Sequence, residues 1–482
     1  MSKPTILFFC YRLMEFKLFI NSKMLSYCSK HFNIIFAVPK STVDDCKKLL
    51  SSDAIVIASK YPSYKMLNVQ KKRKIKTLFE NFFRNILALT YAENKNYEKC
   101  LSQKFQIISS RNAFSKRSLL NKIRINLVIL IAKFASKNSI LRKLIKIIML
   151  IFLKNDFHKD IFFKYKPNLV VVGSMGLDAD GYAIYEAKKN KVKSVVVNQS
   201  WDRTVCKGYP IILPDEFIVW NLHMKEEAKY YLEMPEKNIH VCGAPVWDFL
   251  FNKDNLKNKK EFIEKMNLNP EKPIIYYPMS SAFWHDDLLK NISDFHEAYL
   301  SKKLNNEIQI IFRLHPYYWK NDKQRKELFL KLDKFKNIKN FFIDYNQVEK
   351  GKDFSFLKPE DQNFLLNCYN HSDLCISVTS SSMVEMVLAG KPSVNFLYGN
   401  WLLDNEKIKM QDYVLHHLEK FYDYNIIKHV YNFDELIDVI NNFSELKIDK
   451  EKKNKFINGE FPLNRGNSAQ AYSDCLLSFI KK

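Results

Sequence analysis

Short apolar runs alternate with amphipathic segments along most of the chain. Runs such as TILFFC and NIIFAVP are typical of strands that are buried on both faces. The order strand, helix, strand predicts parallel sheets joined by crossover helices. In the first half we expect strands at 5–10, 33–39, 54–59, 167–173, 194–200, 216–221 and 238–245, and helices at about 13–31, 41–50, 180–191 and 224–232.

A second alternating series follows residues 251–272, a polar and charge-rich stretch with the composition of a linker. We expect its strands at 273–278, 308–316, 340–344, 374–379 and 392–398, and helices at about 286–302, 322–335 and 360–371. The pattern predicts an α/β fold with two doubly wound, Rossmann-like domains at 1–250 and 273–465. Open α/β sheets bind ligands at the carboxyl ends of their strands, so we expect the site in a cleft between the domains.

The first series is interrupted by a basic helical region at about 66–155, an insertion in the first domain. Residues 1–155 hold 30 Lys and Arg against 7 Asp and Glu, so nearly all of the net charge of +24 lies there. From Lys99 to Asn155 no residue is acidic, while Lys and Arg recur at helical spacing between Leu and Ile. This pattern is typical of amphipathic helices lying on an anionic membrane. The membrane-binding candidates are Lys71, Lys72, Arg73, Lys74, Arg142, Lys143 and Lys146.

Two other interpretations of the insertion are open. Its helices could be ordinary core helices with solvated charges. A nucleic-acid surface fits less well, because the insertion is aliphatic rather than interleaved with aromatic residues, and because no nucleic-acid-binding motif is present.

Cysteine usage and the absence of targeting segments indicate the compartment. Nine cysteines are scattered without a C-x-x-C pair, which is typical of reduced thiols in the cytoplasm. The N-terminus has too short an apolar run for a signal peptide, and no window of 18 uncharged apolar residues could span a bilayer. No His, Cys or Asp spacing is typical of a metal site. We therefore expect a cytoplasmic protein that uses no metal and no other cofactor.

The motif RLHP follows the predicted strand that ends near residue 313. Arg313 offers several donors in a planar fork that suits phosphate, and His315 can donate to phosphate or transfer a proton. Pro316 would end the strand and fix the turn. The alternative is that His315 is an incidental histidine after a strand.

Four consecutive hydroxyl residues, Thr379, Ser380, Ser381 and Ser382, follow another predicted strand and open a helix. A helix N-cap needs only one hydroxyl, so the run favours an anion site, although a cap remains the alternative. Glu385 follows on the same helix and could accept bonds from a ribose or a sugar, or could be a solvent-facing helix acid.

Other strand ends carry weaker candidates. Ser280 and Ser281 follow the first strand of the second series and could contact phosphate or could be turn residues. In the first domain, Asp178 and Asp202 are candidate general bases, with Glu15 as a third. Asp178 could instead be a helix cap.

With these motifs, the chain resembles GT-B glycosyltransferases of bacterial surface polysaccharides over nearly its whole length. The resemblance is carried by RLHP (313–316), by the SSS-x-x-E run (380–385) and by IHVCGAPVWDF (239–249), which is similar to the end of a GT-B first domain. An HP motif paired with a Ser motif is similar to those of capsule polysialyltransferases, Kdo transferases and teichoic-acid glycerophosphotransferases. By the same resemblance, the last helix, at 466–482, would cross back to the first domain.

In those families the two motifs hold a cytidine-nucleotide donor. The resemblance therefore implies that His315 contacts the donor phosphate, that Ser380, Ser381 and Ser382 surround it, and that Glu385 lies near the ribose or sugar. It assigns no base, because no residue of the first domain matches a family motif well.

We predict a metal-independent glycosyltransferase that transfers a sugar from a nucleotide-activated donor, with CMP- and UDP-sugars favoured, to a membrane-associated acceptor of a capsule or lipopolysaccharide. The expected partners are the donor, the glycan or glycolipid acceptor and the anionic inner face of the cell membrane, and not nucleic acid. Alternatives on the same fold are a glycerophosphate or phospho-alditol transferase and a nucleotide-sugar epimerase. An alternative of another class is a catalytically silent GT-B module that serves as a membrane-bound scaffold.

Overall fold

The structure is a computed structural model of the chain. It describes residues 3–11, 13–50, 54–60, 82–83, 85–87, 90, 119–153, 156–173, 178–205, 210, 212–279, 288–315, 322–344, 348–350, 355–357, 359–403, 406–409 and 416–480.

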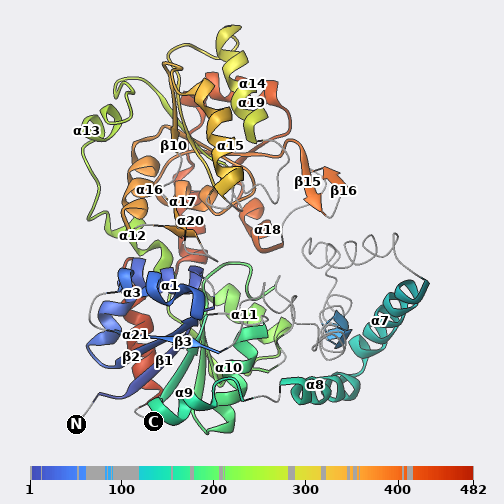
Figure 1. Cartoon of the computed structure of the whole chain (residues 1–482). Helices are drawn as coiled ribbons and strands as arrows, with labels where there is room; N and C mark the ends of the chain where they lie inside the picture. The colour runs from blue at the N-terminus through green and yellow to red at the C-terminus, as the bar shows by residue number, and fades with distance from the viewer. Residues whose placement is uncertain are drawn as a thin grey trace.

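The described N-terminal half is built on a parallel seven-stranded sheet with the order β3-β2-β1-β4-β5-β6-β7 (Figure 1). Its strands are β1 (Thr5–Phe9), β2 (Asn33–Pro39), β3 (Ala54–Ser59), β4 (Leu169–Val172), β5 (Lys193–Val197), β6 (Glu216–Val219) and β7 (Ile239–Val241). Ile6 of β1 pairs with Ile34 of β2 on one side and with Leu169 of β4 on the other. All residues of β4 are buried, as expected for a strand covered on both faces.

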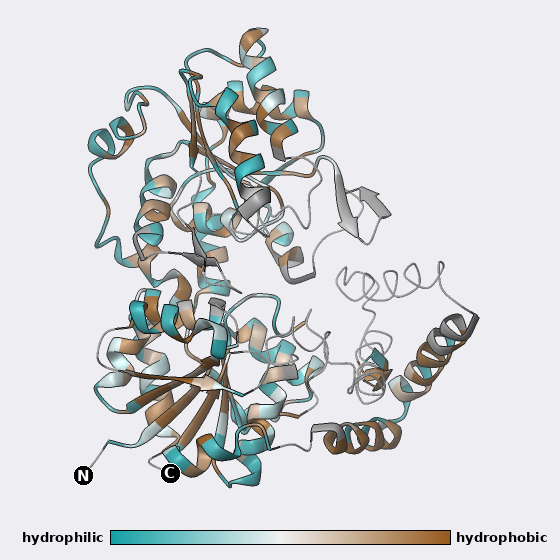
Figure 2. Ribbon diagram, in the orientation of Figure 1, coloured by the Kyte–Doolittle hydropathy of each residue, from teal (hydrophilic) through white to brown (hydrophobic). Residues whose placement is uncertain are grey.

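The described C-terminal half repeats this arrangement with a parallel six-stranded sheet in the order β10-β9-β8-β13-β14-β17. Its strands are β8 (Ile274–Pro278), β9 (Gln309–Arg313), β10 (Phe341–Asp344), β13 (Leu374–Ser377), β14 (Ser393–Phe396) and β17 (Lys428–Val430). Figure 2 shows the strands as the most apolar parts of both halves. The predicted α/β fold with two Rossmann-like sheets is confirmed.

Helices cover both sheets. The N-terminal half holds α1 (Leu13–Asn21), α2 (Met24–Ser29), α3 (Val43–Leu49), α9 (Lys159–Tyr165), α10 (Asp178–Lys189) and α11 (Leu222–Tyr231), and α12 (Asp248–Asn252) and α13 (Lys259–Glu264) lead to the second half. The C-terminal half holds α14 (Leu288–Leu300), α15 (Asp322–Leu332), α16 (Pro359–His371), α17 (Ser382–Leu388), α18 (His416–Asp423), α19 (Phe433–Asn441) and α20 (Lys450–Glu460). Asn side chains cap three of them, because Asn221, Asn258 and Asn432 accept bonds from free amides of α11, α13 and α19.

Two short antiparallel hairpins complete the C-terminal half. They are formed by β11 (Val348–Lys350) with β12 (Ser355–Leu357), and by β15 (Asn400–Leu403) with β16 (Glu406–Lys409). Neither hairpin was predicted from the sequence. The helix α20 was not predicted either, because its sequence KEKKNKFINGE is mostly polar and lacks an apolar stripe.

The last helix, α21 (Ser468–Ser478), returns to the N-terminal half and packs against α2 (Figure 1). Its first turn is held by Asp248, whose carboxylate accepts bonds from the amides of Ser468 at 3.1 Å and Ala469 at 2.9 Å. Burial raises the pKa of Asp248 to about 6, against the effect of these backbone bonds. The termini of the chain therefore meet in the same half of the molecule.

Two further helices, α7 (Leu119–Lys137) and α8 (Ser139–Leu153), belong to the predicted insertion and stand at the edge of the N-terminal half (Figure 1). Lys71, Lys72, Arg73 and Lys74 of the same insertion lie outside the described residues. In the parts of the chain that the structure describes, no helix is both long enough and apolar enough to cross a membrane.

Candidate active site

Both sheets reverse their winding direction next to their first strand. In the N-terminal sheet this switch point lies between β1 and β4, and in the C-terminal sheet between β8 and β13. Doubly wound sheets bind ligands in the crevice at the carboxyl side of such a switch point. The hydroxyl run that follows β13 and the carboxyl end of β8 therefore lie at this switch point. Ser280 and Ser281, which follow β8 in the sequence, lie outside the described residues.

The two halves meet through a cluster of large aromatic side chains centred on Trp201. Its ring centroid lies 5.1 Å from that of Trp247 and 5.3 Å from that of Trp220, both in the N-terminal half. On the other side it lies 5.1 Å from Phe421 and 5.8 Å from Phe461. These close, tilted and edge-on contacts hold the loop that follows β5 against the C-terminal half.

The hydroxyl groups after β13 form a hydrogen-bonded triangle. Ser377 Oγ lies 3.0 Å from Ser380 Oγ and 2.7 Å from Ser382 Oγ, and the last two lie 2.5 Å apart. Ser381, at the start of α17, is exposed and makes no side-chain capping bond. Ser380 Oγ also accepts a bond from the amide of Ser382 at 3.4 Å, so a cap accounts for one hydroxyl of the run but not for the others. Hydroxyl groups that bond one another can rotate to donate to an anion.

The backbone at this loop is held in an unusual conformation. Thr379 has a φ of +45°, which is rare for a β-branched residue, and its amide donates to Asn395 Oδ1 at 2.8 Å. Asn395 is fully buried in β14 and also donates to the hydroxyl of Tyr422 at 2.9 Å. A strained, buried loop of this kind is typical of a ligand-binding turn.

The guanidinium of Arg313, which we predicted to bind phosphate, is paired with two carboxylates of the protein. It is buried and pairs with Asp344 of β10 at 2.5 Å and Asp361 of α16 at 3.6 Å. Burial lowers the pKa of Arg313, but the two carboxylates outweigh it, so the pKa lies above its usual range. The role that this geometry supports is to fix the end of β9, because buried ion pairs hold their partners in one arrangement.

His315 lies two residues beyond Arg313, at the carboxyl end of β9. Burial, together with the positive charge of Arg313, lowers its pKa to about 4. The imidazole is therefore neutral at pH 7. It can donate one hydrogen bond to a phosphate oxygen or accept a proton, but it does not contribute a standing positive charge.

Glu385 bridges the two halves. Its carboxylate accepts a bond from Trp247 Nε1 at 2.9 Å and another from the hydroxyl of Tyr369. The structure shows it holding a tryptophan of the N-terminal half, and its predicted place near a ribose or sugar stays a prediction. Neither partner was identified from the sequence, although Trp247 lies within the quoted IHVCGAPVWDF stretch.

The N-terminal sheet presents acidic and amide side chains at its carboxyl edge. Asp202 follows Trp201 directly, is 19% exposed, and lies 4.0 Å from Arg203 Nε. Glu15 is fully buried and accepts a bond from the amide of Tyr11 at 2.7 Å, which gives it a structural role at the start of α1. The side chain of Asp178 lies outside the described residues.

Gly173, at the end of β4, lets other side chains reach this edge. A Cβ atom at this position would lie 1.8 Å from Gln199 Nε2 and 2.4 Å from Glu15 Cγ. Only glycine leaves room for both.

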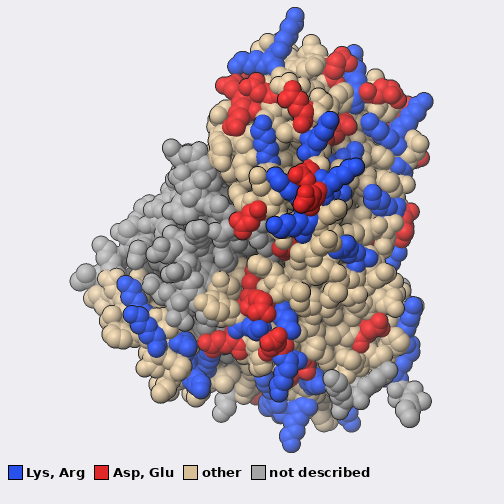
Figure 3. Space-filling view, turned by 180° about the vertical axis from the view of Figure 1, so that it is seen from behind, with Lys and Arg blue, Asp and Glu red and all other residues tan. Residues whose placement is uncertain are grey.

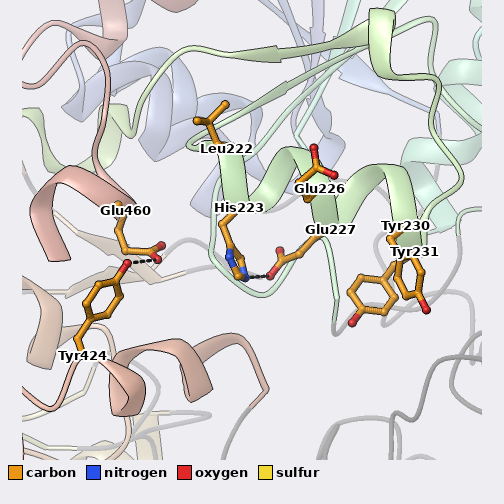
Figure 4. Close-up of a pocket in the computed structure, with 9 residues that line it drawn as sticks. Leu222, His223, Glu226, Glu227, Tyr230, Tyr231, Tyr424 and Glu460 are labelled. Carbon is orange, nitrogen blue, oxygen red and sulfur yellow. Dashed lines mark hydrogen bonds and ion pairs between the residues drawn. The ribbon is translucent and has the colours of Figure 1, made fainter. Parts of the chain in front are cut away.

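A pocket of about 510 Å³ opens between α11 and the end of the C-terminal half (Figure 4). Its walls are Leu222, His223, Glu226, Glu227, Tyr230, Tyr231, Tyr424, Gly459 and Glu460. His223 lies 3.2 Å from Glu227, which also accepts a bond from the Thr204 hydroxyl. Glu460 accepts bonds from Tyr424 at 3.2 Å and from Asn221 at 3.0 Å. The sequence analysis did not identify this pocket, whose walls come from segments more than 190 residues apart.

One family matches the central part of the chain. Its description is CDP-glycerol:poly(glycerophosphate) glycerophosphotransferase, and it matches residues 170–347, which run from β4 through β9 and the HP motif to the end of β10. No curated protein matches the chain.

Solved structures show the fold over the whole chain. The UDP-GlcNAc 2-epimerase of Neisseria meningitidis is 14% identical, covers 99% of this chain and 100% of its own, and superposes with a TM-score of 0.50. A glycosyltransferase of Rickettsia africae ESF-5 is also 14% identical, covers both chains fully and gives a TM-score of 0.50. The chain has the GT-B fold, and the family that matches residues 170–347 indicates a transferase.

A third structure, a variant of the wall teichoic acid polymerase TagF, is 17% identical, covers 65% of this chain and 73% of its own, and gives a TM-score of 0.42. The expected resemblance to GT-B enzymes is confirmed for the fold by the two structures that align over the whole chain. The resemblance to glycerophosphotransferases is supported by the family that matches residues 170–347. The roles of individual residues remain predictions.

Proposed function

We propose that the transferase moves a sugar from a nucleotide-activated donor, a CMP- or UDP-sugar, to a hydroxyl group of a surface-glycan acceptor at the inner face of the cell membrane. The observation that carries this proposal is the triangle of serine hydroxyls at the switch point of the C-terminal sheet, within a GT-B fold. A second candidate is transfer of glycerophosphate or another phospho-alditol. It is favoured by the description of the family that matches residues 170–347.

The donor would lie on the C-terminal half. As the bond between the sugar and the donor phosphate breaks, negative charge develops on the departing phosphate oxygen. Fixed hydroxyl donors at Ser380, Ser381 and Ser382 would stabilise this charge without a metal, and His315 would donate one further bond. Arg313 would act indirectly, by holding the strand end that carries His315.

The acceptor would lie on the N-terminal half. Asp202 is the better supported general base, because the aromatic contacts of Trp201 hold its loop against the donor-binding half. A base there would take the proton of the acceptor hydroxyl as that oxygen attacks. Asp178 remains a second candidate.

The acceptor and the location are the least specified parts of the proposal. The basic first third of the chain would hold the enzyme at an anionic membrane surface, where lipid-linked glycans are extended. The enzyme would then be cytoplasmic and peripheral to the membrane.

The test is thermal unfolding in the presence of CMP, CDP, UMP, UDP, GDP or ADP. A ligand at a hundredfold excess over its Kd stabilises the folded state by about 2.7 kcal/mol. We expect a shift with one nucleotide class, and we expect it to be lost in His315→Ala and in Ser380→Ala. Ser393→Ala is the matched control, because Ser393 is buried in neighbouring β14 and its hydroxyl donates to the carbonyl of Met383, at 3.5 Å, and to no other described residue.

The nucleotide then selects between the candidates. A uridine nucleotide supports sugar transfer, and cytidine nucleotides are compatible with either reaction until a CMP-sugar and CDP-glycerol are compared as donors. No shift with any nucleotide would contradict both candidates and favour a scaffold.

A further inference from the structure

The exposed face of α7 is apolar. Ile123, Leu127, Leu130 and Phe134 recur in steps of four, three and four residues, so they form one stripe along the helix. Each of these side chains is between 45% and 65% exposed. Single exposed apolar residues are ordinary, but a continuous stripe on a helix indicates an interaction surface.

The exposed face of α8 carries an apolar stripe of the same kind. Ile140, Leu144, Ile147 and Ile151 follow the same four, three, four spacing and are between 52% and 76% exposed. Figure 2 shows α7 and α8 as two consecutive helices rich in apolar residues, standing away from the sheet.

The opposite faces of both helices are already used inside the protein. Val128, Ala132 and Ala135 of α7 join Ile145 and Met149 of α8 in a small buried cluster, together with Ile86 and Leu87. The exposed stripes are therefore not the core face of these helices, and this contradicts the interpretation of α7 and α8 as ordinary amphipathic core helices.

The basic side chains of α8 divide into two groups. Lys146 pairs with Glu233 at 2.7 Å, and Arg142 lies 3.6 Å from the same carboxylate and donates to the carbonyls of Ala135 and Ser136. These two residues, which we predicted to bind the membrane, attach α8 to the N-terminal half and to α7. Lys143 is exposed.

The exposed lysines lie at the margin of the apolar stripes. Lys137 follows Phe134 by three residues and Lys143 follows Ile140 by three, so each lies about one helical turn from a member of its stripe. Lys133 is exposed as well. Figure 3 shows this projecting part at the lower left as uncharged surface edged with basic side chains.

The charge pattern distinguishes a lipid bilayer from a second copy of the chain. Two copies joined through these stripes would bring their lysines together, and no acidic residue lies between Lys99 and Asn155 to offset the repulsion. An anionic bilayer offers acyl chains to the stripes and phosphates to the lysines at their margins.

We propose that α7 and α8 lie in the interface of an anionic bilayer, with the two apolar stripes among the acyl chains and with Lys133, Lys137 and Lys143 at the phosphates. The proposal deepens the proposed membrane location and rests on it, but not on the donor chemistry. Arg142 and Lys146 set the angle of the helices relative to the sheet and do not contact lipid.

The experiment is sedimentation of the full chain with vesicles of phosphatidylcholine alone and of phosphatidylglycerol with phosphatidylcholine. Leu144→Ser combined with Ile147→Ser should weaken binding to both kinds of vesicle by more than about tenfold, since burial of each CH₂ contributes to partitioning. Leu330→Ser is the matched control, because Leu330 is 71% exposed on α15, outside the insertion. It should leave binding unchanged.

A second set of variants separates charge from apolar insertion. Lys133→Gln, Lys137→Gln and Lys143→Gln should each weaken binding to phosphatidylglycerol vesicles by about fivefold and should leave binding to pure phosphatidylcholine nearly unchanged. Lys146→Gln should weaken binding to phosphatidylglycerol vesicles by less than these three variants do, because Lys146 is paired with Glu233.

Two results would overturn the proposal. One is unchanged vesicle binding in the Leu144→Ser, Ile147→Ser double variant. The other is a wild-type dimer in analytical ultracentrifugation that this variant converts to a monomer, which would assign the stripes to a second copy. The nucleotide-induced thermal shift should persist in every variant, so failure of the lipid surface is distinguishable from failure of the donor site.

Discussion

The two halves of the molecule share one strand order but present different chemistry at their carboxyl edges. The C-terminal edge carries neutral hydroxyl groups and His315, with the charge of Arg313 already paired. The N-terminal edge carries carboxyl and amide groups, among them Asp202 and Gln199. Hydroxyl donors suit an anionic leaving group, whereas a carboxylate suits the proton of an attacking hydroxyl. The same topology therefore presents groups that suit two different chemical tasks.

The largest expected difference between the halves is in their response to acid. Burial lowers the pKa of His158, in the N-terminal half, to about 3, and the pKa of His315 to about 4. A histidine with a depressed pKa in the folded state is protonated first in the unfolded chain. Stability that is present above pH 6.5 is therefore lost as the pH falls toward the folded-state pKa. At 1.36 kcal/mol per pH unit, the full loss is about 5 kcal/mol for His158 and about 3 kcal/mol for His315.

His158→Gln tests this difference, because a Gln amide can still meet the Tyr11 hydroxyl that lies 3.0 Å from His158 Nε2. Urea unfolding at pH 7 and pH 4.5 should show a pH-dependent loss that is smaller by about 2 to 3 kcal/mol in the variant. His315→Gln should give a similar change at pH 4.5 and a smaller one below pH 4. An unchanged pH dependence in His158→Gln would show that His158 is not buried as a neutral group.

The next expected effect concerns the contact that couples the halves. Trp247→Phe removes the Nε1 donor to Glu385 and leaves a half-satisfied carboxylate, so the free energy of unfolding should fall by about 1.5 to 3 kcal/mol. Trp220→Phe is the control. It lies in the same aromatic cluster, but its Nε1 donates to the carbonyl of Asn198 at 3.2 Å within one half.

A double-mutant cycle of Trp247→Phe with Glu385→Gln should show a coupling energy of about 1 kcal/mol or more. Equal losses in Trp247→Phe and Trp220→Phe, with no coupling, would mean that the aromatic packing alone joins the halves. If the donor sugar displaces Trp247 from Glu385, the nucleotide-bound enzyme should also lose this coupling.

The edges of the sheets could be located from the sequence because parallel strands end at a common edge. Residues 33–39 and 54–59 were predicted as strands and form β2 and β3 with the same limits. The prediction of one helix at about 13–31 was wrong in one respect, because the structure has two helices there. The chain breaks at Lys23, which has a φ of +60°, and the hydroxyl of the preceding Ser22 donates to the carbonyl of Leu18.

The interactions that define the candidate site were less accessible to sequence reasoning. Arg313 was identified, but its partners Asp344 and Asp361 come from a different strand and a different helix. The Glu385–Trp247 bond joins residues that are 138 positions apart. Helical and strand periodicity constrains contacts within an element, and it carries no information on which distant carboxylate meets a given donor.

The smallest expected effect concerns Asp248, whose carboxylate holds the first turn of α21. Its pKa is raised to about 6 in the folded state. Asp248 therefore lowers the free energy of unfolding as the pH rises from about 4 to 6, because the unfolded chain ionises first. This sign is opposite to that of His158. Asp248→Asn removes this cost but keeps only one oxygen for the amides of Ser468 and Ala469, so the two effects partly cancel and stability at pH 7 should change by less than about 1 kcal/mol. The rise in stability between pH 4 and 6 that His158 and His315 produce should become steeper in the variant. If this rise instead becomes shallower in Asp248→Asn, the ionised carboxylate stabilises the start of α21, and the backbone bonds outweigh the burial of its charge.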